Sequence, residues 1–256
     1  MSLLTLIPSR IPEREIEARK DFRGERVFTI DPASAKDLDD ALSIKLNDDG
    51  TYDVGVHIAD VSFFVKPNTA LDRDARKRAT SVYLVQRAVP MLPPALSEQL
   101  CSLIPGQERL TFSIVFTMTK DARVVKKWFG KTIIRSVCVI IYYSAGINIS
   151  IVRSAARLSY QDAQNVIEGK VLGGVAVAPE HNASDIEHDI RNLEELAKKL
   201  REQRLENGTL SLESLRLSFD LDEDGIPVDC GQYRQTDANF LVKEVRLIDD
   251  LPHFKT

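Results

Sequence analysis

The sequence predicts an α+β fold with a mixed, largely antiparallel sheet that carries hairpins and packed helices. Three pairs of segments alternate apolar and polar residues, and a short polar turn joins the members of each pair, as in β-hairpins. The helical patterns lie between these pairs as separate segments and do not form a regular βαβ repeat. The three hairpins are expected at residues 41–61, 109–135 and 215–233.

The composition limits the classes of protein to consider. With 256 residues the chain can form one large domain or two small ones. Its net charge of -4 gives no global basic field, so any RNA binding must come from a local groove. The three cysteines have no metal-like spacing, and the N-terminus does not read as a signal peptide. The uncharged stretch 136–152 falls short of a spanning helix, so no membrane association is expected.

The N-terminal half is expected to be mostly extended. Residues 1–26 are charged and irregular and are interpreted as a linker or as the tail of an upstream domain. A strand over 27–30 comes before the first hairpin, and Asn68 or Thr69 can cap a helix that runs to about Tyr83. That helix carries a basic cluster, which is usually a solvated face but could also meet phosphates. The cluster consists of Arg73, Arg76, Lys77 and Arg78.

The C-terminal half is expected to be mostly helical. Ser159 and Asp162 form a capping-box pattern that starts a helix ending near Gly169. An apolar stripe then predicts a long helix that ends near Gly208, and Asp237 can cap a last helix that starts at the next residue. The stripe is formed by Ile186, Ile190, Leu193, Leu196, Ala197 and Leu200.

The most informative stretch is acidic. Four carboxylates, Asp31, Asp37, Asp39 and Asp40, follow the first strand within about ten residues. If they converge, a hard divalent cation is the natural neutraliser, because such cations prefer oxygen ligands. The plain alternative is a solvated acidic loop, although a strand before it and a hairpin after it make a rigid mount for ligands. A calcium loop of the EF-hand type is disfavoured, because its mid-loop Gly and terminal Glu are lacking.

Several motifs in order carry a resemblance. They are Val27-Phe28-Thr29-Ile30-Asp31-Pro32, Asp37-Leu38-Asp39-Asp40-Ala41-Leu42-Ser43, Val56-His57-Ile58-Ala59-Asp60-Val61 and Ala79-Thr80-Ser81-Val82-Tyr83-Leu84. Together they resemble the catalytic (RNB) domain of the ribonuclease II/R exoribonuclease family. The resemblance is greatest to its eukaryotic, exosome-independent cytoplasmic branch. It covers nearly the whole chain.

The resemblance implies a function and a site. The function is 3′→5′ hydrolysis of single-stranded RNA to nucleoside 5′-monophosphates, with two Mg²⁺ (or Mn²⁺) ions held by the four aspartates. It further implies that Tyr83 packs against the 3′ nucleotide, that Tyr160 closes the RNA channel, and that Glu244 lies near the terminal nucleotide. His57 and Asp60 are interpreted as structural. The implied location is cytoplasmic, single-stranded RNA is the partner, and no stable protein partner is expected.

The sequence also departs from the family pattern. Residues 137–154 form an apolar insert, interpreted as a translated retained intron and an aggregation liability, and residues 245–256 form a non-family tail. Between them and the N-terminal linker, residues 27–244 are expected to be a partial RNB catalytic domain, without the upstream OB or cold-shock domains. The chain is therefore interpreted as a truncated fragment. The alternative is a catalytically inactive RNA-binding or regulatory relative, or a non-functional gene-model product.

Overall fold

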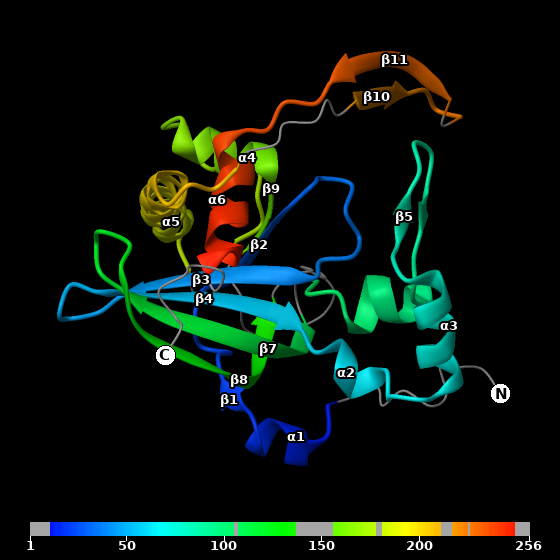
Figure 1. Cartoon of the computed structure of the whole chain (residues 1–256), viewed down its shortest axis with the longest axis horizontal. Helices are drawn as coiled ribbons and strands as arrows, with labels where there is room; N and C mark the ends of the chain where they lie inside the picture. The colour runs from blue at the N-terminus through cyan, green and yellow to red at the C-terminus, as the bar shows by residue number, and fades with distance from the viewer. Residues whose placement is uncertain are drawn as a thin grey trace, which may run out of the picture.

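A mixed β-sheet forms the centre of the chain (Figure 1). The computed structural model describes residues 11–104, 107–136, 156–177, 181–210, 217–224 and 226–248. Within these residues the sheet has seven strands in the order β1-β8-β7-β4-β3-β2-β9, and only the pairs β1–β8 and β2–β9 are parallel. This confirms the predicted α+β class with a largely antiparallel sheet. The strands are β1 (Lys20–Asp21), β2 (Val27–Asp31), β3 (Asp40–Leu46), β4 (Tyr52–Ala59), β7 (Gln107–Met118), β8 (Val124–Ser136) and β9 (Ala156–Ser159).

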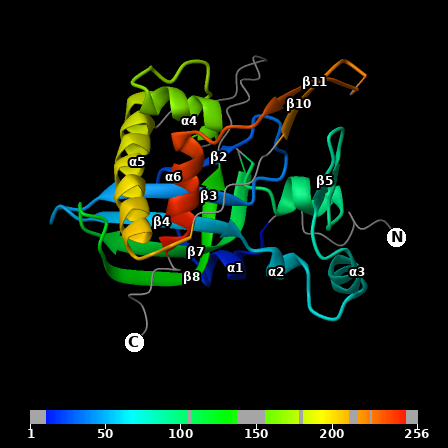
Figure 2. The ribbon, with the colours of Figure 1, turned by 45° about the horizontal axis from the view of Figure 1, so that its top comes forward.

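Three helices cover one face of the sheet (Figures 1 and 2). They are α4 (Tyr160–Ile167), α5 (Ala183–Glu206) and α6 (Asp237–Arg246). The predicted apolar stripe of α5 is buried and packs in one cluster with sheet residues such as Leu42 and Phe116. The predicted capping box at the start of α4 is present, since Ser159 and Asp162 exchange hydrogen bonds. Burial of these apolar side chains is the main force that holds the helices on the sheet.

A second apolar cluster packs around the connection between β2 and β3. It includes Leu38 and Leu103, both fully buried, and is completed by α2 (Val61–Phe64), α3 (Ala70–Arg78) and a π-helical turn, η2 (Ala95–Leu100). The helix predicted to reach Tyr83 was too long. It ends at Arg78 because Ala79 adopts a φ of 63°, and the chain continues into a small hairpin, β5 (Val82–Tyr83) and β6 (Ala88–Val89).

The segment expected to be a linker is partly built into the fold. Residues 13–17 form helix α1 (Glu13–Glu17), and β1 pairs with β8 and forms one edge of the sheet. Between them Arg19 is buried, with its Nη2 2.7 Å from Asp60 Oδ2 and its Nη1 3.3 Å from the carbonyls of Thr111 and Thr132. The charged sequence of this segment did not predict the contact. An arginine can be buried when all its donors find acceptors.

The third predicted hairpin is confirmed as β10 (Leu217–Leu221) and β11 (Pro227–Gln232), which form a separate two-stranded sheet with exposed residues on both faces. The predicted insert 137–154 lies outside the described residues, as do residues 249–256 of the predicted tail. Residues 245–248 are part of the fold, because α6 runs to Arg246 and both Val245 and Ile248 are buried in the core. No helix among the described residues is long and apolar enough to cross a membrane.

Candidate functional site

The connection between β2 and β3 carries the four aspartates, which we call the acid cluster: Asp31, Asp37, Asp39 and Asp40. Asp31 is the last residue of β2 and Asp40 the first of β3. These strands are antiparallel neighbours, paired through Val27 and Ser43, so the two ends of the connection lie close together. The charges of Asp39 and Asp40 both act on Asp31, and those of Asp37 and Asp40 act on Asp39. The structure therefore brings the four predicted carboxylates together.

Three hydrogen bonds tie the connection to the segment after η2. Leu38 is fully buried, and its backbone N–H donates to Ser102 Oγ at 2.9 Å. The Ser102 hydroxyl donates in turn to the Lys36 carbonyl at 2.8 Å, and the N–H of Leu103 donates to the Leu38 carbonyl at 2.8 Å. The buried leucine and its paired backbone groups hold the acid cluster in one conformation.

Arg157 anchors the start of the β2–β3 connection from β9, the neighbour of β2 on the side away from β3. Arg157 lies on β9, next to β2, and its Nη2 donates to the carbonyls of Ala33 and Ala35 at 3.0 and 2.7 Å. Its positive charge also lowers the pKa of Asp31. Arg157 thus contributes both a mechanical tie and a partial counter-charge.

Electrostatics within the acid cluster favours a cation. Burial, followed by the charges of Asp40 and Asp39, raises the pKa of Asp31 to about 7, although the nearby Thr29 hydroxyl and Arg157 oppose this. Partial burial and then the neighbouring carboxylates raise the pKa of Asp39, and burial raises that of Asp40. In the described part of the chain, the buried Oδ2 of Asp31 makes no hydrogen bond of normal geometry. A bound cation would remove these penalties.

Both predicted tyrosines lie beside the acid cluster. Tyr83 Oη donates to Asp37 Oδ2 at 2.6 Å, and this hydrogen bond is the main cause that raises the pKa of Tyr83 to about 12. Its side chain is otherwise open, since Tyr83 is 67% exposed. Tyr160, the first residue of α4, is partly buried, and burial followed by the charges of Asp31 and Asp40 raises its pKa. A base entering the cluster could therefore meet one exposed ring and one partly covered ring.

The seventh predicted residue lies elsewhere. Glu244 is 2% exposed, and Arg204 of α5 clamps its carboxylate with Nε at 2.8 Å and Nη2 at 2.6 Å. On α6 it precedes Arg246 by two residues, so the two side chains leave the helix on nearly opposite sides. Glu244 therefore joins α5 to α6, and its expected contact with a nucleotide has no support from this position.

Another basic residue reaches the acid cluster that the sequence did not indicate. Arg246 Nη1 lies 3.3 Å from Asp40 Oδ1, and its charge partly offsets the rise in the pKa of both Asp39 and Asp40. No local pattern marked Arg246, because its partner is 206 positions away and it falls in the predicted tail. The same holds for Arg157, whose acceptors are more than a hundred residues away in the sequence.

The acid cluster is not closed around a metal position. Among the described residues, no three His, Cys, Asp or Glu side chains are placed to hold one ion together. The donor set nevertheless fits Mg²⁺, which needs only one or two carboxylates and completes its shell with waters and substrate phosphates. The buried, unpaired oxygen of Asp31 is the first such donor. One oxygen of Asp37 is engaged by Tyr83 and one oxygen of Asp40 by Arg246, so each of these contacts competes with a cation for its carboxylate.

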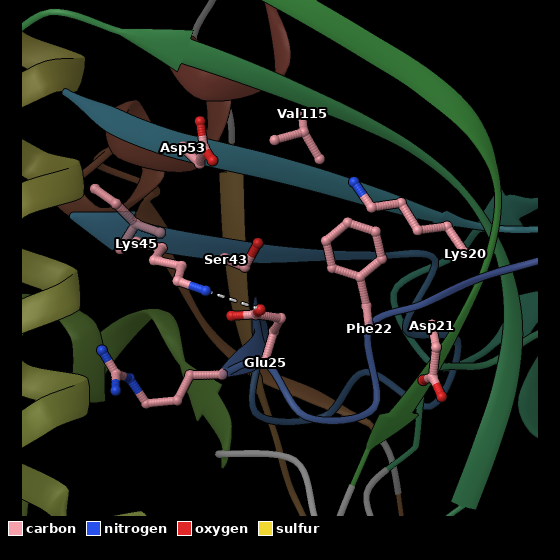
Figure 3. Close-up of a pocket in the computed structure, with 10 residues that line it drawn as sticks. Lys20, Asp21, Phe22, Glu25, Ser43, Lys45, Asp53 and Val115 are labelled. Atoms are coloured by element: carbon pink, nitrogen blue, oxygen red, sulfur yellow. Dashed lines mark hydrogen bonds and ion pairs between the residues drawn. The ribbon is translucent and has the colours of Figure 1, made fainter. Parts of the chain in front are cut away.

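A cavity of about 220 Å³ lies between β1 and the strands β3, β4 and β7 (Figure 3). Its charges cancel, because three basic and three acidic side chains line it. Within the lining, Lys45 Nζ lies 3.1 Å from Glu25, while Arg26 pairs with a residue outside it, with its Nε 2.6 Å from Asp189. With no surplus charge, this cavity is a poorer candidate than the acid cluster for handling a polyanion. The lining charges are Lys20, Arg26, Lys45, Asp21, Glu25 and Asp53.

The chain is similar to curated proteins over almost its whole length. It is 46% identical over 242 residues to the DIS3-like exonuclease 2 of Schizosaccharomyces pombe, with 93% of this chain and 24% of the relative covered. It is 42% identical over 255 residues to the "Inactive exonuclease DIS3L2" of Arabidopsis thaliana, with 98% of this chain and 22% of the relative covered. The chain thus spans about a quarter of the length of these curated relatives.

The fold and the family agree with this similarity. A solved structure, Mycoplasma genitalium RNase R in complex with ribose methylated single-stranded RNA, superposes with a TM-score of 0.79 at 23% identity. That alignment covers 95% of this chain and 34% of the RNase R chain, and it supports the fold. The family model described as "RNB domain" matches residues 19–146 and 143–248. The chain therefore belongs to the RNB-domain family, as the sequence predicted.

Proposed function

We propose that this chain is the acid-cluster part of an RNB catalytic domain that degrades single-stranded RNA from its 3′ end to nucleoside 5′-monophosphates. The observation that carries the proposal is the convergence of Asp31, Asp37, Asp39 and Asp40 on one anchored connection, with a buried and unpaired oxygen on Asp31. Membership in the RNB family and the names of the relatives, which are exonucleases, support the same reaction. We infer that Mg²⁺ or Mn²⁺ is the cofactor and that the cytoplasm is the location.

In this proposal the four aspartates hold the metal ions. Two bound Mg²⁺ ions would supply an activated water and would stabilise the leaving oxygen of the phosphodiester. The chain's own residues place the RNA: the exposed ring of Tyr83 offers a stacking face, and its hydroxyl orients the carboxylate of Asp37. Stacking tolerates any base and contributes roughly 1–3 kcal/mol per base, which suits an enzyme without sequence preference. Tyr160, at the start of α4 and within range of the charges of Asp31 and Asp40, would close the RNA channel.

The proposal also divides the chain. Residues 27–244 would form the partial catalytic domain, 1–26 would join it to an upstream OB or cold-shock domain, and 137–154 would be an insert. The two matches to the family model meet within this insert, at residues 143–146, which supports an interruption there. The burial of Arg19 and Val245 supports edges of the folded unit slightly outside 27–244.

The test is nucleotide release by the purified chain. A 5′-labelled single-stranded RNA with a free 3′ end is incubated with Mg²⁺, and products are resolved by length and by mass. We expect stepwise shortening from the 3′ end, with nucleoside 5′-monophosphates released, and no reaction after EDTA or in Asp39→Asn. Asp48→Asn is the matched control, because Asp48 is an exposed carboxylate in the β3–β4 turn. A folded chain that releases no nucleotide would overturn the enzymatic proposal.

The second candidate is an RNA-binding relative without catalysis. The Arabidopsis relative with 42% identity carries the name of an inactive exonuclease, so the family includes members described in that way. In that case Asp39→Asn should leave RNA affinity unchanged, and the parent chain should retain RNA without shortening it. A filter-binding or anisotropy titration with the same RNA, run beside the nuclease assay, separates the two candidates.

A further inference from the structure

Arg246, near the end of α6, forms an ion pair with the acid cluster. Its Nη1 lies 3.3 Å from Asp40 Oδ1, at a carboxylate that is only 14% exposed. The contact engages one oxygen of a proposed metal ligand, on the residue where β3 begins. A metal ion bound to Asp40 and the guanidinium of Arg246 would therefore both neutralise the charge of the same carboxylate.

The position of Arg246 follows from rigid neighbours. Val245 and Ile248, on either side of it, are each 1% exposed and belong to the core cluster under the helices. They fix the last turn of α6 against the sheet, and the helix C-terminus there favours a positive charge. The side chain of Arg246 itself is 52% exposed. Its backbone is therefore held, while its guanidinium can exchange between Asp40 and solvent.

We propose that Arg246 is a built-in counterion of the acid cluster, which holds Asp40 while no divalent cation is bound and competes with that cation for the carboxylate. This inference rests on the proposed metal site. It accounts for why the cluster is not closed around a metal position: Asp40 is turned to Arg246, as Asp37 is to Tyr83.

If Arg246 competes with the cation for Asp40, removal of the guanidinium should raise the affinity of the chain for metal. Removing the guanidinium takes away a rival for Asp40 and a like charge beside the cation, so Arg246→Gln should bind Mn²⁺ and Mg²⁺ more tightly than the parent. We expect a decrease of the dissociation constant of about two- to fivefold, since a half-exposed ion pair is weak and screened. Arg246→Lys keeps the charge and should stay close to the parent. Without metal, Arg246→Gln should melt slightly earlier, and saturating Mg²⁺ should reduce or reverse that difference.

The experiment titrates the purified chain with Mn²⁺ in metal-free buffer at pH 8 and measures free Mn²⁺ by electron paramagnetic resonance. Lys243→Gln is the matched control, because Lys243 is an exposed cation on the same helix, one turn earlier. It should change the affinity less than Arg246→Gln does. Suppose that Asp39→Asn abolishes Mn²⁺ binding but Arg246→Gln binds Mn²⁺ no more tightly than the parent. That result would overturn the inference about Arg246 and leave the proposed metal site standing. If the parent binds no Mn²⁺, the proposed metal site itself fails.

Discussion

Buried polar side chains on the sheet face away from α5 form a hydrogen-bonded chain centred on His57. His57 is fully buried, with Nε2 3.0 Å from Ser43 Oγ and Nδ1 2.7 Å from Ser113 Oγ. The chain continues from Ser113 to Thr132 Oγ1 at 2.5 Å. Both ring nitrogens are satisfied by neutral hydroxyls, which agrees with the structural role predicted for His57.

Burial lowers the pKa of His57 to about 3, so this residue makes stability depend on pH. The unfolded chain binds a proton near pH 6.5, well above the folded pKa. The stabilisation is therefore complete above about pH 6.5 and is lost as the pH falls toward 3. The contribution of His57 alone should fall by about 2 kcal/mol between pH 7.5 and pH 5. In His57→Gln this part of the pH dependence should disappear, although the variant is less stable at neutral pH.

Urea unfolding at pH 7.5 and pH 5.0 measures this effect. His188→Gln is the control for the loss of a histidine, because His188 is exposed on α5 and lies outside the hydrogen-bonded chain. A His57→Gln variant that loses as much stability on acidification as the parent would show that His57 is not the group responsible.

Gly55 leaves room for the same hydrogen-bonded chain. A Cβ added there would overlap Ser43 Oγ and lie 2.8 Å from His57 Nε2, so the Ser43–His57 hydrogen bond could not survive unchanged. We expect Gly55→Ala to lower the free energy of unfolding by about 1–3 kcal/mol. Gly24→Ala, where nothing lies within 4 Å, should change it by less than about 0.5 kcal/mol. Equal urea midpoints for the two variants would contradict the steric argument.

At the scale of elements, the acid cluster depends on the segment after η2. In Ser102→Ala the buried N–H of Leu38 and the Lys36 carbonyl lose their shared partner. An unsatisfied buried group costs about 1–3 kcal/mol, and the connection should also hold its carboxylates less firmly. We therefore expect lower stability together with weaker Mn²⁺ binding. Ser97→Ala is the control, since Ser97 Oγ makes only one long contact of 3.4 Å to Pro93. Lower stability with unchanged Mn²⁺ affinity would mean that this anchor does not shape the site.

Elements with a strong local signal could be predicted, and those set by distant contacts could not. The alternation in β7 and β8 and the capping box of α4 are local, and both were confirmed. The end of α3 depends on the left-handed backbone of Ala79, a conformation that alanine rarely adopts and that no turn residue announced. In the site, the spacing of the aspartates was visible, whereas the anchors Ser102 and Arg157 act across 64 or more positions.

At the scale of the whole molecule, the sheet curls so that its two edges approach. β8 and β9 lie near opposite ends of the strand order, yet β2, the neighbour of β9, is in contact with β8. Val27 of β2 and Ile134 of β8 are buried in the same apolar cluster. The end of β8 at Ser136 can therefore be connected to the start of β9 at Ala156 by a short link.

This geometry predicts that residues 137–154 can be removed without loss of the fold. The deletion variant should unfold cooperatively, because β8 and β9, on either side of the segment, both contribute buried residues to the core clusters. It should also stay monomeric at higher protein concentration, since an uncharged run rich in β-branched residues promotes association. Thermal unfolding and light scattering after gel filtration test both points. A deletion variant that loses cooperative unfolding would show instead that the segment is needed to join β8 to β9.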